Sequence, residues 1–157
     1  MRRKDREVTD WKEICEIINR CEVCSIAFFD EEYPYVIPMN FGTRLEEDQV
    51  TLYFHGARAG KKLELLEKNN HVAFEMNCSR RLVTGEKACQ YSMEFESVCG
   101  HGIMELVEEE EKEQAFTALM RQYAPTETFE YHPLHMKAIS LLRLTVTEIT
   151  GKRLKKQ

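Results

Sequence analysis

The sequence predicts a mainly β protein, a small β-barrel with peripheral helices. Three observations indicate this class: about six or seven segments show strand-like alternation, two of them form a predicted hairpin, and about three helical segments lie scattered among them. A doubly wound α/β sheet would need regular alternation of strands and helices, which the consecutive hairpin strands argue against. We therefore expect one domain that spans residues 1–157.

The first third of the chain predicts one helix and one hairpin. Apolar residues recur at helical spacing over residues 11–21, and Asp10 before them is a favourable N-cap. Extended segments at residues 25–29 and 33–41 flank an acidic turn, which is the pattern of a β-hairpin. Pro38 cannot donate a ladder hydrogen bond, so we expect the second strand to lie at a sheet edge or to carry a bulge.

The middle of the chain predicts two strands with a short helix between them. Residues 49–55 and 71–76 show the two-residue alternation of strands, and for residues 71–76 the pattern is that of a half-buried strand. Residues 61–68 carry leucines at helical spacing and are followed by two asparagines, which favour a helix end. Residues 78–90 are polar and basic without clean periodicity, so we expect a loop there.

The last third predicts a bent strand, a helix and a closing strand. Residues 91–107 are rich in strand formers, and a Gly-His-Gly segment in their middle favours a bulge, so they form one bent strand or two. Residues 108–123 predict a helix with an acidic first turn. A short helical piece at residues 132–139 precedes a strand at residues 140–149, and residues 151–157 are expected to form a basic tail.

The composition argues against several partners and locations. A formal charge of -5 gives no general attraction to nucleic acid or to anionic membranes, so we expect neither as a partner. No apolar run approaches the length of a membrane span and no apolar segment follows the basic N-terminus, so we expect a cytoplasmic protein. The six cysteines are then expected as free thiols, and the lone C-x-x-C pair, Cys21 and Cys24, predicts no metal site.

The most informative segment is residues 53–62, Tyr-Phe-His-Gly-Ala-Arg-Ala-Gly-Lys-Lys. It runs from an apolar strand through small residues into lysines that open a helix. Small residues let backbone amides approach a phosphate, and a helix N-terminus adds partial positive charge. The segment therefore predicts a site for a phosphate-bearing cofactor, although an ordinary structural turn would explain the same spacing.

Motifs in a shared order then identify a family. Residues 35–41 (Tyr-Val-Ile-Pro-Met-Asn-Phe), residues 52–57 (Leu-Tyr-Phe-His-Gly-Ala) and Gly60-Lys61-Lys62 resemble the pyridoxamine 5'-phosphate oxidase-like FMN-binding split barrels. Residues 82–89 and 97–102 are similar to the nitroimidazole-resistance (Nim) type within that superfamily. The resemblance runs from the first helix to Gly151, and it implies an FMN-binding split barrel.

The resemblance also implies a homodimer with two FMN molecules at the subunit interface, each held by both chains. By matching positions, it implies three groups of flavin contacts. The polar edge of the isoalloxazine would meet backbone groups of Ile37, Pro38, Met39, Asn40 and Phe41. The phosphate and ribityl chain would be held by His55, Gly56, Ala57, Lys61 and Lys62, and the neighbouring subunit would contribute Tyr91, Ser97 and Val98. Of these residues, His55 is the candidate for proton transfer.

The activity implied is that of an FMN-dependent oxidoreductase that reduces a small organic acceptor, such as a nitroimidazole or another nitro compound. The flavin would carry the chemistry. The sequence has no nicotinamide fingerprint, so a donor such as NADH or NADPH would bind transiently over the flavin face. The alternative is a flavin- or haem-binding protein without turnover that uses the same barrel, with His55 or His101 as an iron ligand.

Overall fold

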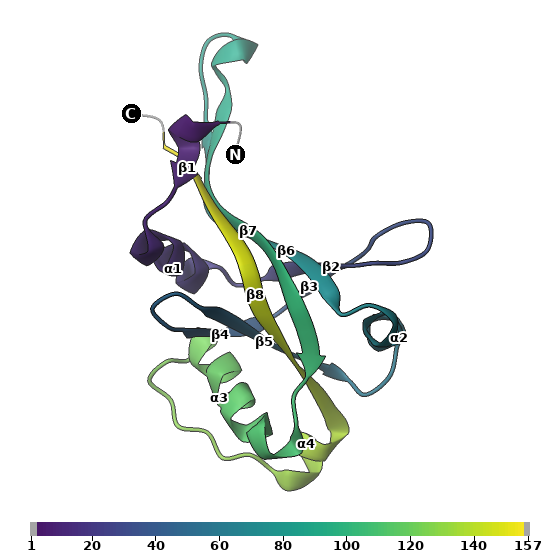
Figure 1. Cartoon of the computed structure of the whole chain (residues 1–157). Helices are drawn as coiled ribbons and strands as arrows, with labels where there is room; N and C mark the ends of the chain where they lie inside the picture. Colours follow the sequence, from purple (N-terminus) through teal and green to yellow (C-terminus); the bar gives the residue numbers. More distant parts are fainter. Residues whose placement is uncertain (1–2, 156–157) are drawn as a thin grey trace.

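The computed structural model describes residues 3–155, and its centre is one antiparallel sheet of eight strands (Figure 1). The mainly β class with peripheral helices is confirmed, and the fold is a split barrel. In chain order the elements are η1 (Lys4–Arg6), β1 (Glu7–Val8), α1 (Trp11–Arg20), β2 (Cys24–Phe28), β3 (Tyr35–Met39), β4 (Phe41–Leu45), β5 (Val50–Ala57), α2 (Lys61–Lys68), β6 (His71–Val83), η2 (Ala88–Gln90), β7 (Ser92–Leu106), η3 (Glu109–Glu111), α3 (Lys112–Tyr123), α4 (Pro133–Ala138) and β8 (Ile139–Leu154).

The two edge strands of the sheet follow each other in the chain, with one residue between them. The hydrogen-bonded order is β3-β2-β6-β7-β8-β5-β4, with β1 added beside β8, so β3 and β4 are edges and the sheet is not closed. The chain nevertheless passes from β3 to β4 across Asn40 alone. The prediction of one strand over residues 33–41 was therefore wrong at its end, because Phe41 leaves the β2–β3 hairpin and pairs with Phe54 of β5. The edge position expected from Pro38 is confirmed.

Three long strands, β6, β7 and β8, cross the molecule, and the β6–β7 hairpin extends beyond the rest of it (Figure 1). The single bent strand is confirmed, since the β7–β8 register shifts between His101 and Gly102. The loop predicted at residues 78–90 was wrong in its first half, because β6 continues to Val83. A register shift between Cys78 and Arg81 breaks the alternation there, and this irregularity hid the strand from a periodicity argument.

Another difference lies near the C-terminal end of the chain. Residues 151–154 of the predicted tail belong to β8, where Gly151 pairs with both Val8 and Val98. Pairing on both sides keeps this polar segment extended, although its own pattern is not that of a strand. Residues 156–157 of that predicted tail lie outside the described residues.

The first helix begins at a side-chain cap, and α3 packs directly against the sheet. Asp10 caps α1, accepting a hydrogen bond from the amide of Glu13 at 2.9 Å. The α3 helix lies directly on β4, since a Cβ built on Gly42 would collide with backbone atoms of Leu119. Among residues 3–155, no helix is long and apolar enough to cross a bilayer.

Two apolar clusters meet at β5, which is buried on both faces. Val50, Leu52 and Phe54 belong to the larger core, whereas Tyr53 belongs to a smaller one with Leu141. Phe116 of α3 packs against that smaller core. The alternation predicted for this strand is therefore confirmed, and the structure adds that both faces are buried over residues 50–54.

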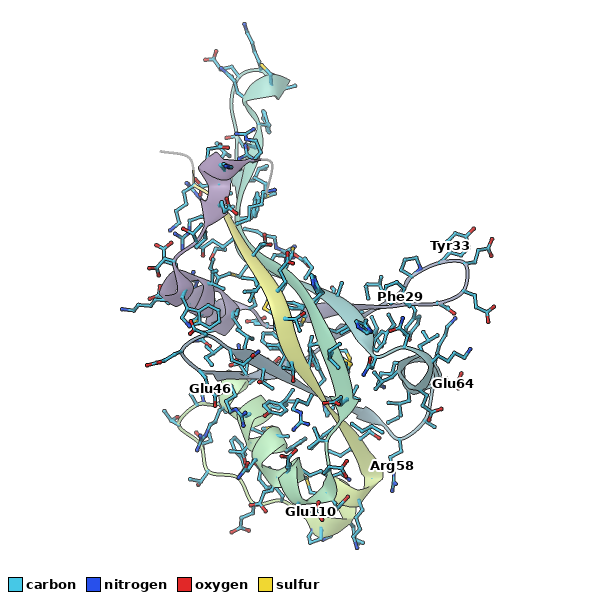
Figure 2. All side chains as sticks on the ribbon, viewed as in Figure 1. Phe29, Tyr33, Glu46, Arg58, Glu64 and Glu110 are labelled. Carbon is cyan, nitrogen blue, oxygen red and sulfur yellow. The ribbon has the colours of Figure 1, made fainter. Side chains whose placement is uncertain are left out.

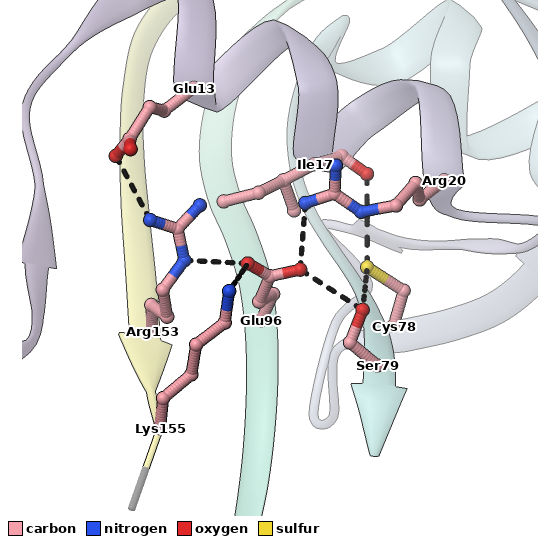
Figure 3. Close-up of polar contacts among 8 residues, drawn as sticks. All are labelled: Glu13, Ile17, Arg20, Cys78, Ser79, Glu96, Arg153 and Lys155. Carbon is pink, nitrogen blue, oxygen red and sulfur yellow. Dashed lines mark hydrogen bonds and ion pairs between the residues drawn. The ribbon is translucent and has the colours of Figure 1, made fainter. Parts of the chain in front are cut away.

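A buried carboxylate ties α1 to the three long strands (Figure 3). The Glu96 side chain is 4% exposed; it accepts hydrogen bonds from Arg20 at 2.7 Å, Arg153 at 2.5 Å and Ser79 at 3.0 Å. Burial would raise the pKa of Glu96, but these hydrogen bonds outweigh it and lower the pKa to about 2. Ser79 has a left-handed backbone, with φ of 55°, at the β6 irregularity, so the strained residue also serves this network.

Candidate functional site

The corner between β5 and α2 offers an uncapped helix start. Gly60 is the N-cap of α2 with φ of 126°, a conformation that favours glycine, and no side chain caps the helix. The Gly60 carbonyl accepts from the amides of Leu63 and Glu64, which begins the helical ladder. The amides before them have no intrahelical acceptor, because that is the geometry of every helix start. The corner can therefore receive an anion.

The two lysines that open α2 have different surroundings. Lys61 Nζ lies 2.5 Å from Asp30 Oδ2, and that hydrogen bond raises the pKa of Lys61. Lys62 instead lies over Gly56, where a Cβ on that glycine would be 2.6 Å from Lys62 Nζ. Lys62 is therefore the lysine beside residues 55–57, whereas Lys61 already has an acidic partner.

His55 lies in β5 next to this corner, with its ring half-buried. Its ring centre is 6.1 Å from that of Phe116, and its Nδ1 is buried without a hydrogen-bond partner among the described residues. Burial, and then the charge of Lys62, lower the pKa of His55. The imidazole is thus held neutral near pH 7, and the unpartnered nitrogen is available to a bound group.

These observations test whether the corner fits a flavin phosphate. Among the described residues, no side chain caps the helix start and no group bonds the buried Nδ1 of His55. The missing side chain at Gly56 leaves room for the Lys62 ammonium group. A cavity of about 570 Å³ lies on another side of α2; its walls include Gly60 but neither His55 nor Lys62, and they carry Glu64, Glu67 and Glu105, so this cavity is not the anion site. The residues fit an anionic group, and the charge of Lys62 would compensate it.

Arg58 takes no part in this arrangement. Its guanidinium donates to the Lys137 carbonyl at 2.9 Å, so it links the corner to α4 (Figure 2). The sequence left it open whether this side chain meets a phosphate or solvent. In the structure it holds the end of β5 against the segment before β8.

The predicted segment of residues 37–41 lies beside the segment that contains His55. Phe41 pairs with Phe54, so residues 37–41 end next to His55. Ile37 is half-buried and Pro38 exposed, whereas the Met39 and Phe41 side chains point into the core. A ligand on this strand would therefore meet the backbone and the exposed Asn40, in agreement with the backbone contacts expected for this segment.

The third predicted group is distant from His55 along β8. His55 pairs with Leu141 and Ser97 pairs with Lys152, positions about eleven residues apart on β8, or about 35 Å of extended strand. Across the other side of the sheet the separation is smaller, because only β6 and β2 lie between β7 and β3, so Val98 is about 14 Å from Met39. Tyr91 is 52% exposed, Ser97 is half-buried, and the Val98 side chain lies in the core. One chain thus brings residues 37–41, 55–57 and 61–62 together, and Ser97 lies far from His55 along β8 but not from residues 38–39.

Sequence reasoning missed three residues around the site. Asp30 was read as part of a turn, but it binds Lys61. Phe116 contacts His55, and Tyr123 binds the β3–β4 corner. Helical spacing predicts an inward side chain at both positions, which is right for the half-buried Phe116 and wrong for Tyr123, which is 41% exposed. Helical spacing also does not reveal which strand residue a helix meets.

Comparison with known proteins agrees with the fold. The chain is similar to a candidate 5-nitroimidazole antibiotic resistance protein from Bacteroides thetaiotaomicron VPI-5482, at 35% identity over 94% of this chain and 86% of that one, with a TM-score of 0.80. It is similar in fold to the flavocytochrome Anf3 from Azotobacter vinelandii (21% identity, 99% and 72% covered, TM-score 0.81). It is also similar in fold to a FAD and haem binding protein from Mycobacterium smegmatis (17%, 96% and 74%, TM-score 0.84). A comparison with curated proteins gave no significant match.

The class defined by this fold is the flavin-binding split barrel. The family described as pyridoxamine 5'-phosphate oxidase matches residues 10–153, nearly the whole chain. The chain therefore belongs to the pyridoxamine 5'-phosphate oxidase-like family, as its motifs predicted.

Proposed function

We propose that this chain is an FMN-dependent oxidoreductase that reduces a small organic acceptor, such as a nitroimidazole or another nitro compound. The observation that carries the proposal is the β5–α2 corner, where an uncapped helix start, Lys62 and a neutral His55 converge. The nitro acceptor is supported by the 35% identity to a candidate 5-nitroimidazole resistance protein over most of both chains.

Each part of the corner has a role in the proposal. Lys62 and the first amides of α2 would hold the phosphate, since a dianion needs both charge and donors. The backbone of residues 37–41 would bind the polar edge of the ring. FMN, when bound, supplies the electron transfer, while the protein orients it and sets its surroundings. Lys61, held by Asp30, would fix the start of α2 rather than approach the phosphate.

His55 would act at this site mainly as a neutral hydrogen-bonding group. Its lowered pKa leaves little imidazolium near pH 7, so proton donation from His55 would become effective only in more acidic solution. Its unpartnered Nδ1 can accept or donate one hydrogen bond, depending on the tautomer. We keep His55 as the candidate for moving a proton at the acceptor.

The complete site in this proposal needs a second copy of the chain. The strand partners of Ser97 and His55 lie about eleven residues apart on β8, which supports the proposal that Tyr91, Ser97 and Val98 complete the site of a partner in a homodimer. Val98 would contribute through its backbone, because its side chain is buried. NADH or NADPH would act as a transient donor over the open flavin face.

The first test is the absorption spectrum of the purified native protein, followed by heat release and chromatography of any ligand. We expect FMN at about one per chain, bleaching of the flavin band by NADH or NADPH, and reoxidation by a nitroimidazole. Bound FMN that neither NADH nor NADPH bleaches would favour the alternative of a flavin-binding protein without turnover. A Soret band, or no uptake of added FMN, would reject the proposal in favour of the haem-binding alternative or of a protein without cofactor.

A further inference from the structure

The corner between β3 and β4 is held by a side chain from a distant helix. The amide of Phe41 donates to the hydroxyl of Tyr123, at 2.9 Å. The same hydroxyl donates to the Glu22 carbonyl at 2.8 Å and lies 3.3 Å from Asn40 Nδ2. Asn40 also donates to the Glu22 carbonyl at 3.3 Å. One phenol therefore joins α3, the end of β3 and the segment before β2.

The hydrogen bonds use the full capacity of that hydroxyl. A phenol has one proton to donate and two lone pairs to accept. Glu22 takes the proton, and Phe41 and Asn40 supply the two donors. In Tyr123→Phe, the three partners of the hydroxyl would hydrogen-bond to water instead, and water can reach them because Tyr123 is 41% exposed. The loss should therefore loosen the corner without unfolding the protein.

The helix that carries Tyr123 is itself firmly placed. The Gln122 amide donates to the carbonyls of Ile18 and Cys21 at 3.3 and 3.2 Å, and its oxygen accepts from Thr43 of β4 at 3.3 Å. The close approach of Leu119 to Gly42 fixes the middle of α3 on β4. A helix anchored at these points can hold the Tyr123 hydroxyl at a constant position.

The same helix reaches the other half of the candidate site. Phe116, two turns before Tyr123, packs against His55, and the Tyr131 ring meets Phe116 edge-on with centres 5.4 Å apart. Thus α3 contacts both residues 40–41 and His55, the two segments that would border one flavin.

We propose that Tyr123 is a positioning residue of the flavin site, one that fixes the Asn40–Phe41 backbone against which the isoalloxazine edge would bind. The inference rests on the proposed function for its link to flavin. Its structural part, the restraint of the corner, stands on the contacts alone. Tyr123 touches no reacting atom in this proposal and acts through the backbone of residues 40–41.

The structural part is tested without any ligand, by amide hydrogen exchange in Tyr123→Phe. We expect the Phe41 amide to exchange about tenfold faster than in the unchanged protein, since its hydrogen-bond acceptor is gone. Tyr33→Phe removes a hydroxyl from the exposed β2–β3 loop and should leave exchange at Phe41 unchanged (Figure 2). Equal exchange at Phe41 in Tyr123→Phe and the unchanged protein would overturn the inference.

The link to flavin is tested with FMN itself. In Tyr123→Phe we expect the dissociation constant of FMN to rise about five- to tenfold and the absorption bands and midpoint potential of bound FMN to shift. Asp10→Ala removes the N-cap of α1 without touching α3 or residues 40–41, so it should lower the melting temperature but leave the bound spectrum unchanged.

The outcomes separate the inference from the proposed function. FMN binding that is unchanged in Tyr123→Phe, or a spectral shift of the same size in Asp10→Ala, would overturn the positioning role while the proposed function stands. Failure of the unchanged protein to bind FMN would overturn the proposed function and the link to flavin together, whatever the exchange result.

Discussion

At the scale of single residues, the structure separates two lysines that the sequence treats as equal. Lys61 already forms an ion pair with Asp30, whereas Lys62 crosses Gly56 beside His55. We expect Lys62→Met to weaken FMN binding by about tenfold or more, because it removes the charge that faces the anion corner. Lys61→Met should weaken it less than threefold. Fluorescence titration with FMN measures both.

A larger loss of FMN affinity in Lys61→Met than in Lys62→Met would contradict this prediction. The larger loss in Lys61→Met would mean that Lys61 leaves Asp30 when flavin binds, and it would contradict the role given to Lys62. Asp30→Asn distinguishes that case, since it frees Lys61 without removing its charge. Higher FMN affinity in Asp30→Asn would show that the ion pair competes with the phosphate.

The limits of sequence reasoning about the site follow from the same residues. The small residues, helix start and lysines of 53–62 define an anion corner because their chemistry is local. Asp30, Phe116 and Tyr123 reach the site only through tertiary contacts across many residues. No local pattern specifies such a partner, so the sequence predicted the segments that border the site but not the residues that hold them.

At the scale of elements, the Glu96 network joins α1 to β6, β7 and β8. We expect Glu96→Gln to lower the free energy of unfolding by about 2–3 kcal/mol at pH 7, because it leaves Arg20 and Arg153 without their buried carboxylate. Urea denaturation checks this. The matched control is Glu46→Gln, which breaks an exposed ion pair with Arg44 and should change the free energy by less than about 0.5 kcal/mol.

The same network predicts a pH dependence. The pKa of Glu96 in the folded protein is about 2, below its ordinary value of 4.5. A carboxyl with a depressed folded pKa stabilises the fold above its unfolded pKa and loses that stabilisation as pH falls toward the folded value. The difference in stability between the unchanged protein and Glu96→Gln should therefore shrink between pH 4.5 and 2. A constant difference would contradict the assignment.

Elements with a regular pattern were predictable, and irregular ones were not. Asp10 and the helical spacing after it define α1, and the glycines of residues 100–102 mark the bend in β7. The second half of β6 was missed because Ser79 and the register shift beside it break the alternation. The strand β4 was missed because Phe41 ends one apolar pattern while it begins another pairing.

At the scale of the whole molecule, the distance along β8 bears on assembly. The strand partners of His55 and Ser97 lie about eleven residues apart on β8, or about 35 Å of strand, while Ser97 and Val98 approach residues 38–39 across β6 and β2. If each site takes residues from two chains, as proposed above, two defective subunits can complement each other.

We expect this complementation between Lys62→Met and the double variant Tyr91→Ala, Ser97→Ala. Each homodimer should bind FMN weakly, because every site carries one of the two defects. In a heterodimer, one site carries both defects and the other carries none. Random exchange at equal concentrations makes half of the dimers heterodimers, so about one quarter of all sites should regain full affinity.

The measurement is an FMN titration of the mixture after denaturation and joint refolding, with sedimentation to count subunits and with each variant refolded alone as the control. Recovery of about a quarter of the sites would require that Lys62 of one chain and Tyr91 and Ser97 of the other act on the same flavin. Normal binding by the double variant alone would remove Tyr91 and Ser97 from the site. Two defective variants that never recover would mean that the flavin contacts lie within one chain, so residues 91–98 would affect binding only through the fold.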